Sequence, residues 1–365
     1  MKYDYLIVGA GMFGAVFAER ATAAGKTVLV IDQRPHVRGN CYTREVEGIQ
    51  IHEYGPHIFH TNNEKVWNYI RQFAKFNHFI NRVKVNSGGR IYSFPVNMMT
   101  FHQLWGVTTP DEAKRRLVEE VEQIPNPQNM EERLLSRVGR QIYETFYHGY
   151  TIKHWRTSPR NLPASIGDRI PIRFTYDDNY YNDCFQGIPI GGYTPIFERL
   201  LNRAEVRLQT PLESIRNWRS IAKKMVYSGR PDSLLSYQFG ELAYLTLDFR
   251  HEVSTGDYQG VAQMNFPEID VPYTRCVEHK HFEFGTQRST VITREYPTDW
   301  HSAATPYYPV PGNEERYARY RDEILQTGDI ILGGRLGRHQ YFDMHMVIAN
   351  ALDQAEKELS TRSSL

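Results

Sequence analysis

The sequence lacks the residue patterns on which several enzyme classes depend. Its 365 residues include three cysteines and no Cys-x-x-Cys pair. An odd number of widely spaced thiols is typical of a reducing compartment. We expect Cys41, Cys184 and Cys276 each to pack as a small apolar side chain. Neither the Gly-x-Ser-x-Gly turn of serine hydrolases nor the His-Glu-x-x-His motif of zinc peptidases occurs. The sequence therefore offers no evident protein nucleophile and no spacing typical of metal ligands.

An excess of one charge and long apolar runs are also missing. Lys and Arg number 43 against 42 Asp and Glu, which gives a net charge of +1. The chain thus has no global field that would attract nucleic acid or a membrane surface. No apolar run approaches the length of a membrane span, and the N-terminus lacks the basic region and cleavage site of a signal peptide. We expect a cytoplasmic protein without nucleic-acid or membrane partners.

The N-terminus, in contrast, carries a complete nucleotide-binding pattern. Tyr3–Val8 is a short apolar run, Phe13–Ala24 has helical composition, and Thr27–Asp32 is a second apolar run. This order predicts a strand, a glycine-rich turn, a helix and a strand, which is the unit that binds dinucleotides. A glycine-rich turn without a ligand is the alternative.

Within this unit the glycines and one acid have separate roles. Gly9 permits the tight turn, Gly11 lets the backbone approach a pyrophosphate, and Gly14 lets the helix pack close to the strand. Asp32 ends the second strand, where its carboxylate can accept hydrogen bonds from a ribose without a 2′-phosphate. The pattern by itself does not separate NAD from FAD.

Two further segments are expected to approach the same cofactor. The basic loop after Asp32, which contains Gly39 and Asn40, can continue along the pyrophosphate. Near the C-terminus, the apolar run 330–332 leads into glycines that begin at Gly333. No strand with a terminal acid follows them. We therefore expect one nucleotide site and no separate NAD(P)H domain.

A Gly-Pro turn at 54–61 carries two histidines. His57 and His60 have no acidic or cysteine partner at ligand spacing, so no metal site is expected there. An imidazole beside the cofactor and a plain surface turn both remain open. Thr61 and Glu64 match a capping box, which predicts a helix from about 64 to 74.

The rest of the chain is expected to form helices and antiparallel strands. Residues 82–94 predict a β-hairpin around a Ser-Gly-Gly turn. Thr109 and Pro110 predict a helix start. The further expected elements are a helix at 129–147, strands at 242–249, 281–285 and 291–296, an aromatic turn at 306–309, and a helix at 344–359.

Residues 150–175 combine positive charge with aromatic rings. Asp168 is the only acid among them, and three prolines exclude one long helix. Arginine forks match phosphate oxygens, and aromatic faces stack on a base. A nucleoside diphosphate site and a solvated basic loop are both compatible with this composition. The stretch contains Tyr150, Lys153, His154, Trp155, Arg156, Arg160, Arg169 and Arg173.

Longer motifs follow one another over nearly the whole chain. They are Val8–Gly14, Tyr54–Thr61, Leu162–Ser165, Arg173–Tyr180, Tyr193–Pro195, Pro272–Arg275, Glu278–Phe284, Pro306–Val310, Gly333–Gly337 and Tyr341–Met344. With these motifs the chain resembles the UDP-galactopyranose mutase family. The resemblance implies an α/β fold with a Rossmann-type FAD-binding domain of the glutathione-reductase and amine-oxidase kind, a small helical-bundle domain and a twisted antiparallel-sheet domain.

The resemblance also implies how these domains divide the chain. The FAD-binding domain is expected to be discontinuous, and a mobile substrate loop is expected to follow the helical domain. The expected segments are 1–80, 186–238 and 325–365 for FAD, 97–150 for the helices, 151–175 for the loop, and 81–96, 176–185 and 239–324 for the sheet.

The implied reaction is the isomerisation of UDP-galactopyranose to UDP-galactofuranose without net redox change. FAD is implied as the cofactor, active when reduced, with its N5 as the nucleophile at the anomeric carbon. The family also implies a homodimer and a role in polysaccharide biosynthesis. The lack of a protein nucleophile agrees with this, because the cofactor then supplies the difficult chemistry.

Position in the family's motifs implies roles for individual residues. Arg169 and Arg275 match its diphosphate-binding arginines, and His57 matches a residue beside the flavin. The implied substrate contacts are Phe146, Tyr150, Trp155, Tyr180, Asn265, Tyr308, Tyr341 and His60, with Tyr307 able to replace Tyr308. The implied cofactor contacts are Gly9, Gly11, Phe13, Gly14, Asp32, Gly39, Asn40, His57, Arg335, Asp343 and Met344.

The chain departs from the family in a few places. Leu245 stands where an arginine is usual, and His345-Met346 stands where Asp-Lys is expected; residues 151–156 also differ. These changes leave the sugar nucleotide open between UDP-galactose, UDP-N-acetylgalactosamine and a TDP-linked deoxysugar. A flavin oxidoreductase of the amine-oxidase type and a non-catalytic flavin- or nucleotide-binding module are the rival hypotheses.

Overall fold

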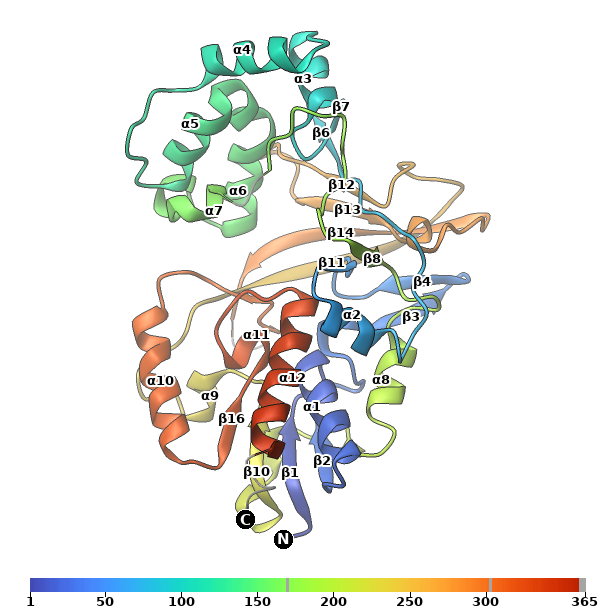
Figure 1. The fold of residues 1–365 in the computed structure, drawn as a ribbon, viewed down its shortest axis with the longest axis vertical. Helices are drawn as coiled ribbons and strands as arrows, with labels where there is room; N and C mark the ends of the chain where they lie inside the picture. Colours follow the sequence, from blue (N-terminus) through green and yellow to red (C-terminus); the bar gives the residue numbers. More distant parts are fainter. Residues whose placement is uncertain (169–170, 302–303, 361–365) are drawn as a thin grey trace.

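The computed structural model describes residues 1–168, 171–301 and 304–360. A five-stranded parallel sheet forms its lower part, in the order β16-β10-β1-β2-β9 (Figure 1). Four of the six residues of the central strand are buried and none is exposed, as expected where helices cover both faces of a parallel sheet. The strands are β1 (Tyr3–Val8), β2 (Val28–Ile31), β9 (Glu205–Arg207), β10 (Ala222–Tyr227) and β16 (Ile330–Leu332).

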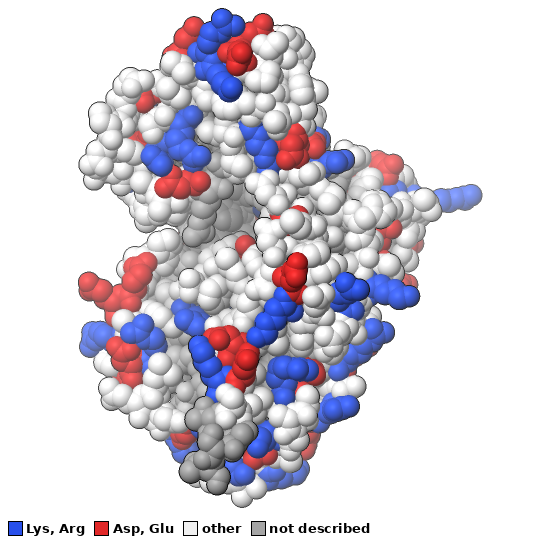
Figure 2. Space-filling view, viewed as in Figure 1, with Lys and Arg blue, Asp and Glu red and all other residues white. Residues whose placement is uncertain are grey.

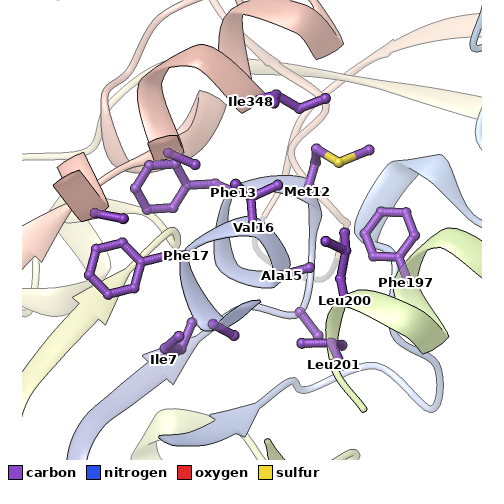
Figure 3. Packing of buried hydrophobic residues seen from close by; sticks show 14 of the residues in the cluster. Ile7, Met12, Phe13, Ala15, Val16, Phe17, Phe197, Leu200, Leu201 and Ile348 are labelled. Carbon is purple, nitrogen blue, oxygen red and sulfur yellow. The ribbon is translucent and has the colours of Figure 1, made fainter. Parts of the chain in front are cut away.

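Helix α1 (Met12–Ala23) is surrounded by apolar side chains (Figure 3). Phe197 and Leu200 of α8 (Thr194–Leu200) and Ile348 of α12 (Met344–Ser360) pack around it. Residues 12–18 are all buried, so this part of the helix needs no polar stripe, whereas Glu19, Arg20 and Thr22 near its end are only half-buried. The first and last helices of the chain therefore share one core.

The upper part of the molecule is a helical lobe, which we define as residues 98–168 (Figure 1). The helix start predicted at Thr109 and Pro110 is confirmed, because Thr109 and Glu112 form a capping box with Pro110 in the first turn. The helices are α3 (Met98–Trp105), α4 (Pro110–Glu120), α5 (Met130–Ile142), α6 (His148–Trp155) and α7 (Ala164–Asp168). A π-helical turn, Tyr143–Tyr147, joins α5 to α6.

A seven-stranded sheet lies between these two parts, in the order β15-β11-β14-β13-β12-β6-β7. Its neighbours are antiparallel except for β12 and β6, which run parallel. The strands are β6 (Lys84–Ser87), β7 (Arg90–Ser93), β11 (Tyr244–Thr255), β12 (Gln263–Asn265), β13 (Arg275–Glu278), β14 (Ser289–Asp299) and β15 (Tyr308–Pro309).

Short elements complete the described chain. They are two antiparallel strand pairs and four smaller helices. These elements are β3 (Thr43–Val46), β4 (Ile49–His52), β5 (Phe59–Thr61), β8 (Phe185–Gly187), α2 (Glu64–Ile70), α9 (Pro231–Leu234), α10 (Glu314–Gln326) and α11 (Gly334–Gly337). Among the described residues no helix has the length and apolar character required to cross a bilayer. The domain boundaries inferred from the resemblance remain a prediction.

The expected strand at 281–285 is wrong. His279–Glu283 is a 3₁₀ turn, and the strand β13 ends before it. Lys280 holds the turn, because its buried Nζ pairs with Asp257 at 2.7 Å and donates to the Gly256 carbonyl at 2.7 Å. Phe282 is buried but Phe284 is exposed, whereas residues two apart in a strand would lie on the same face of the sheet.

Three other expectations need correction. The N-cap of α2 is Asn63, which accepts from the Val66 amide, and the helix ends at Ile70 rather than 74. Thr61 instead accepts from the Asn63 amide ahead of the helix. Helical structure continues past 147 through α6, so residues 151–155 are not a loop. Cys184 is exposed, whereas the other two cysteines are buried.

Candidate active site

A cavity of about 540 Å³ opens at the carboxyl ends of β1, β2 and β10. Parallel sheets bind ligands at this edge, where the glycine-rich turn leads into a helix. The cavity wall contains every predicted cofactor residue except Gly14 and Asp343. Those that line it are Gly9, Gly11, Phe13, Asp32, Gly39, Asn40, His57, Arg335 and Met344. The glycines at 333–337 also reach it through Gly334, as the sequence predicted.

The three motif glycines meet different surroundings. Gly9 has a φ of 104°, and a Cβ there would lie 2.1 Å from Ser228 Oγ. A Cβ on Gly14 would lie 2.0 Å from the Gly9 carbonyl oxygen, so this glycine lets α1 approach β1. A Cβ on Gly11 would meet only the Gly39 Cα, at 3.9 Å. The open side of Gly11 therefore faces the cavity rather than packed protein.

Polar groups in the cavity wall suit a dinucleotide that contains a diphosphate. The Asp32 carboxylate accepts from the Ala10 amide at 2.8 Å and from the Arg34 amide at 2.9 Å, and it retains lone pairs for a ribose. Arg34 Nη1, Arg38 Nε and Arg230 Nε are buried without a hydrogen-bond partner. Buried donors without partners are costly, so an anion in the cavity would satisfy them. The residues present thus fit FAD.

His57 presents a neutral imidazole to the cavity. Its Nδ1 donates to the Gly55 carbonyl at 2.8 Å, because that oxygen can only accept. Burial lowers the pKa of His57 to about 4, and the charge of Arg335 acts in the same direction. At neutral pH its Nε2 can therefore accept a hydrogen bond but not donate one.

Arg275 is the cation of a second group of side chains. It starts β13 and donates to Glu295 at 3.2 Å, to the Tyr150 hydroxyl at 3.2 Å and to Asn265 Oδ1 at 3.4 Å. Burial opposes its charge, but the Glu295 carboxylate raises the pKa of Arg275 well above its usual value. Its side chain keeps 22% exposure, so part of the fixed guanidinium can contact a ligand.

Aromatic rings connect the Arg275 group to the cofactor cavity. Tyr308 contacts the rings of His154, Trp155 and Tyr341 at centroid distances of 5.2, 5.8 and 6.2 Å. Tyr307 instead lines the cavity, and its hydroxyl donates to the Tyr54 carbonyl. Tyr308 thus lies among the predicted substrate residues and Tyr307 lies at the cofactor cavity, and the substrate role of Tyr308 stays a prediction. Figure 2 shows the molecule hollowed between the helical lobe and the part below it.

Other predicted substrate residues form a row of rings. Tyr180 contacts Tyr181, and Tyr181 stacks on His60 with centroids 3.6 Å apart. Phe146 is buried in the core of the helical lobe and contacts Phe94, which in turn contacts Tyr180. The structure thus brings His60 and Tyr180 together and places Phe146 behind them.

The described part of the basic stretch at 150–175 is not a plain solvated loop. Lys153 is buried, and its Nζ donates to the carbonyls of Phe266, Val271 and Tyr273 at 2.6–2.9 Å. Arg160 pairs with Glu131 at 3.0 Å. The Lys153 contacts fasten α6 to the connection between β12 and β13, whereas the Arg160 pair lies within the helical lobe. Arg169, the other predicted diphosphate arginine, lies outside the described residues.

Sequence reasoning missed Glu295, Tyr181 and Asp183. Tyr181 directly follows Tyr180, the last residue of the Arg173–Tyr180 motif, so its position in the sequence could have pointed to it. Glu295 lies opposite Arg275 in the β13–β14 register, and burial raises the pKa of its carboxyl. Asp183 meets His60 only through the fold. No local pattern reveals these two pairings.

Buried histidines predict a loss of stability in acid. His279 Nδ1 accepts from the His52 amide at 3.2 Å, and its Nε2 contacts Thr293 Oγ1 at 2.6 Å, which fixes a neutral ring. Burial lowers the pKa of His279 to about 3. Below pH 6.5 the unfolded ring binds a proton and the folded ring does not. The free energy of unfolding should therefore fall as pH decreases from 6.5 to about 4, by about 1.4 kcal/mol per pH unit for such a group.

Urea unfolding at a series of pH values tests this expectation. His279→Gln should flatten the slope of unfolding free energy against pH, whereas the same replacement at the exposed His301 should leave it unchanged. Equal slopes in the wild type and His279→Gln would show that His279 does not contribute.

Comparison with known proteins agrees with this geometry. Residues 145–341 match the family described as UDP-galactopyranose mutase, and residues 7–73 match an NAD(P)-binding Rossmann-like domain. The protein named probable UDP-galactopyranose mutase of Klebsiella pneumoniae is 42% identical over 98% of this chain and 95% of its own length. The dTDP-fucopyranose mutase of Escherichia coli is 38% identical over 96% and 97%.

Solved structures show the same fold. A reduced UDP-galactopyranose mutase has a TM-score of 0.78 over 100% of this chain and 95% of its own, at 13% identity. A variant of putrescine oxidase has a TM-score of 0.59 over 99% and 100%, also at 13% identity. Together with the sequence identities over almost the full length, these matches establish that the chain belongs to the UDP-galactopyranose mutase family.

Proposed function

We propose that this enzyme isomerises UDP-galactopyranose to UDP-galactofuranose with bound FAD. One observation carries the proposal: a permanently charged Arg275 stands among aromatic rings that lead to the dinucleotide cavity. The arginine suits a diphosphate, the rings suit a base and a sugar, and the cavity suits the cofactor. The 42% identical relative is named for this reaction.

Reduced FAD, when bound, supplies a nucleophilic nitrogen for the anomeric carbon, so the protein needs no nucleophile of its own. The chain's residues bind and orient the substrate and stabilise charge. Arg275 stabilises the negative charge that develops on the departing diphosphate, because its donors are already oriented by Glu295 and Asn265. His57 offers an acceptor at the cofactor, and Arg335 holds the Phe342 carbonyl at 2.7 Å.

Activity is expected with reduced flavin and not with oxidised flavin. The wild type treated with dithionite under anaerobic conditions should convert UDP-galactopyranose, whereas the untreated enzyme should be inactive. Product is measured by chromatography of the sugar nucleotides. Equal turnover of both preparations would contradict the proposed role of the flavin. Consumption of substrate with a matching amount of reductant would instead indicate an oxidoreductase.

Ligand binding should change the fluorescence of Trp155. This ring ends α6, contacts Tyr308, and lies within residues 151–175, the segment predicted to move over the substrate. Addition of UDP to the wild type should change tryptophan emission, and Trp155→Phe should remove most of that change. Trp218→Phe is the matched control, since its ring packs in a different core beside the parallel sheet. No change in the wild type would contradict closure over the ligand.

A related sugar nucleotide is the second candidate. The dTDP-fucopyranose mutase relative is nearly as similar as the Klebsiella protein, and His345 lies beside His60, near the predicted sugar residues. Reduced enzyme incubated separately with UDP-galactopyranose, UDP-N-acetylgalactosamine and a TDP-deoxysugar distinguishes these substrates. The highest kcat/KM identifies the one that the site is built for.

We also propose that the enzyme acts in the cytoplasm as a homodimer and supplies furanose units for polysaccharide biosynthesis. The family resemblance supports the dimer and the pathway. The free thiols of Cys41, Cys184 and Cys276 are compatible with a reducing compartment. Sedimentation equilibrium of the purified protein tests the dimer, and fractionation of the source cells tests the compartment.

A further inference from the structure

We propose that His60, Asp343 and His345 bind a divalent transition-metal cation at the edge of the substrate site. One nitrogen or carboxylate oxygen from each of the three residues lies within 4.8 Å of the other two. The residues come from β5 and from the start of α12, so the fold rather than the sequence spacing brings them together. This is why the sequence predicted no metal site at His60.

His60 is already oriented as a metal ligand. Its Nδ1 contacts the Asp183 carboxylate at 2.5 Å, which leaves Nε2 as the free nitrogen. Tyr181 stacks on the ring with an interplanar angle of 10° and fixes its plane. A carboxylate that accepts from one nitrogen of a histidine while the other binds the metal is the usual outer partner of such a ligand.

His345 supplies a second imidazole. Its ring meets the His60 ring edge to face at 4.9 Å, and its Nδ1 is buried without a hydrogen-bond partner. An imidazole nitrogen without a hydrogen-bond partner can donate its lone pair to a cation. Asp343, two residues earlier, adds a negative charge. Burying an unsatisfied nitrogen is unfavourable, and a cation would satisfy it.

The ligand set defines the class of cation. Two imidazoles and one carboxylate suit zinc and its first-row neighbours, with one or more positions left for water or substrate. Two ligands of a tetrahedral zinc lie about 3.4 Å apart when each bond is about 2.1 Å. The side chains must therefore close slightly on the ion, and the half-buried His345 on the first turn of α12 can rotate to do so.

The test is calorimetric titration of chelator-treated holoenzyme with ZnCl₂. All proteins carry Cys184→Ser, because this thiol is exposed and could bind zinc itself. We expect one Zn²⁺ per chain, confirmed by metal analysis after dialysis. His345→Ala should weaken the affinity by at least about tenfold, and Asp183→Asn should weaken it by about 10- to 100-fold. His345→Asp should restore much of it, which shows that the fold is intact.

A matched control uses the other candidate cluster of the described residues, Asp257, Glu278 and His281. His281→Ala should leave the zinc affinity unchanged. The proposal is overturned if the parent protein shows no saturable binding, if His345→Ala binds as tightly as the parent, or if His281→Ala alone removes binding. None of these measurements depends on the substrate, so they can fail while the proposed function stands.

Discussion

Arg275→Ala should lower kcat/KM for UDP-galactopyranose by about 10- to 150-fold or more, since one charge-assisted hydrogen bond contributes about 1.5–3 kcal/mol. The larger value is expected because the diphosphate is also the leaving group, where charge grows as the bond to C1 breaks. The variant should lose turnover but keep its bound flavin, since Arg275 does not line the dinucleotide cavity. Kinetics at matched flavin content measure the effect.

Two further variants separate this catalytic loss from a folding defect. Arg275→Ala leaves the Glu295 carboxylate buried without its partner, which costs on the order of 3–5 kcal/mol of stability. Arg275→Ala combined with Glu295→Gln removes that unpaired charge and should recover stability but not activity. Arg275→Lys should recover little activity, because a point charge does not reproduce the planar fork. A kcat/KM within about threefold of the wild type would reduce Arg275 to an ordinary ion pair, worth at most ~1 kcal/mol.

Gly11→Val should yield a folded but colourless protein. The backbone of Gly11 has φ −79° and ψ −175°, a conformation that valine adopts readily. A Cβ there meets no packed atom closer than 3.9 Å. The added methyl groups would project into the cavity, where they occupy the space of the pyrophosphate. Flavin content is read from the absorbance ratio at 450 and 280 nm and from FAD released by heating.

Gly14→Val is the matched comparison from the same motif. Its Cβ would overlap the Gly9 carbonyl, so helix α1 could not stay against β1 and the protein should lose its fold as well as its flavin. Circular dichroism distinguishes the two outcomes. Gly11→Val that purifies yellow with wild-type FAD content would contradict the placement of the pyrophosphate.

The N-terminal unit could be predicted because its signals are local. The apolar runs, the three glycines and Asp32 lie within one short segment, and each acts on its immediate neighbours. Strand β10, in contrast, has no local signal in the sequence. It carries Lys223 and Lys224 in its first half, so neither alternation nor a continuous apolar run marks it. Pairing with β1 and β16 makes it a strand.

The candidate site likewise contains residues that the sequence predicted and residues that only the fold reveals. The motif resemblance pointed to Arg275, Tyr150 and Tyr308, and the structure places them in one group. The partner Glu295 and the pairing of His60 with Asp183 depend on which strands become neighbours. The sequence grouped Lys153 with a phosphate-binding loop because of its charge. In the structure Lys153 is buried, and its Nζ donates to three backbone carbonyls instead. The charge of a segment alone does not show which of its side chains will be buried.

The strand order of the parallel sheet has a consequence for how the protein is made. Tyr3 pairs with Ala222, and Met225 pairs with Ile330. At about 5–20 residues per second, the ribosome finishes β16 tens of seconds after β1. During that time β1 has β2 beside it but lacks β10 for most of synthesis, and α1 lacks α12 until the end. Pairing over such separations is slow once the chain is free. The nascent chain should therefore depend on chaperones, and a stalled or truncated product should be unable to retain flavin.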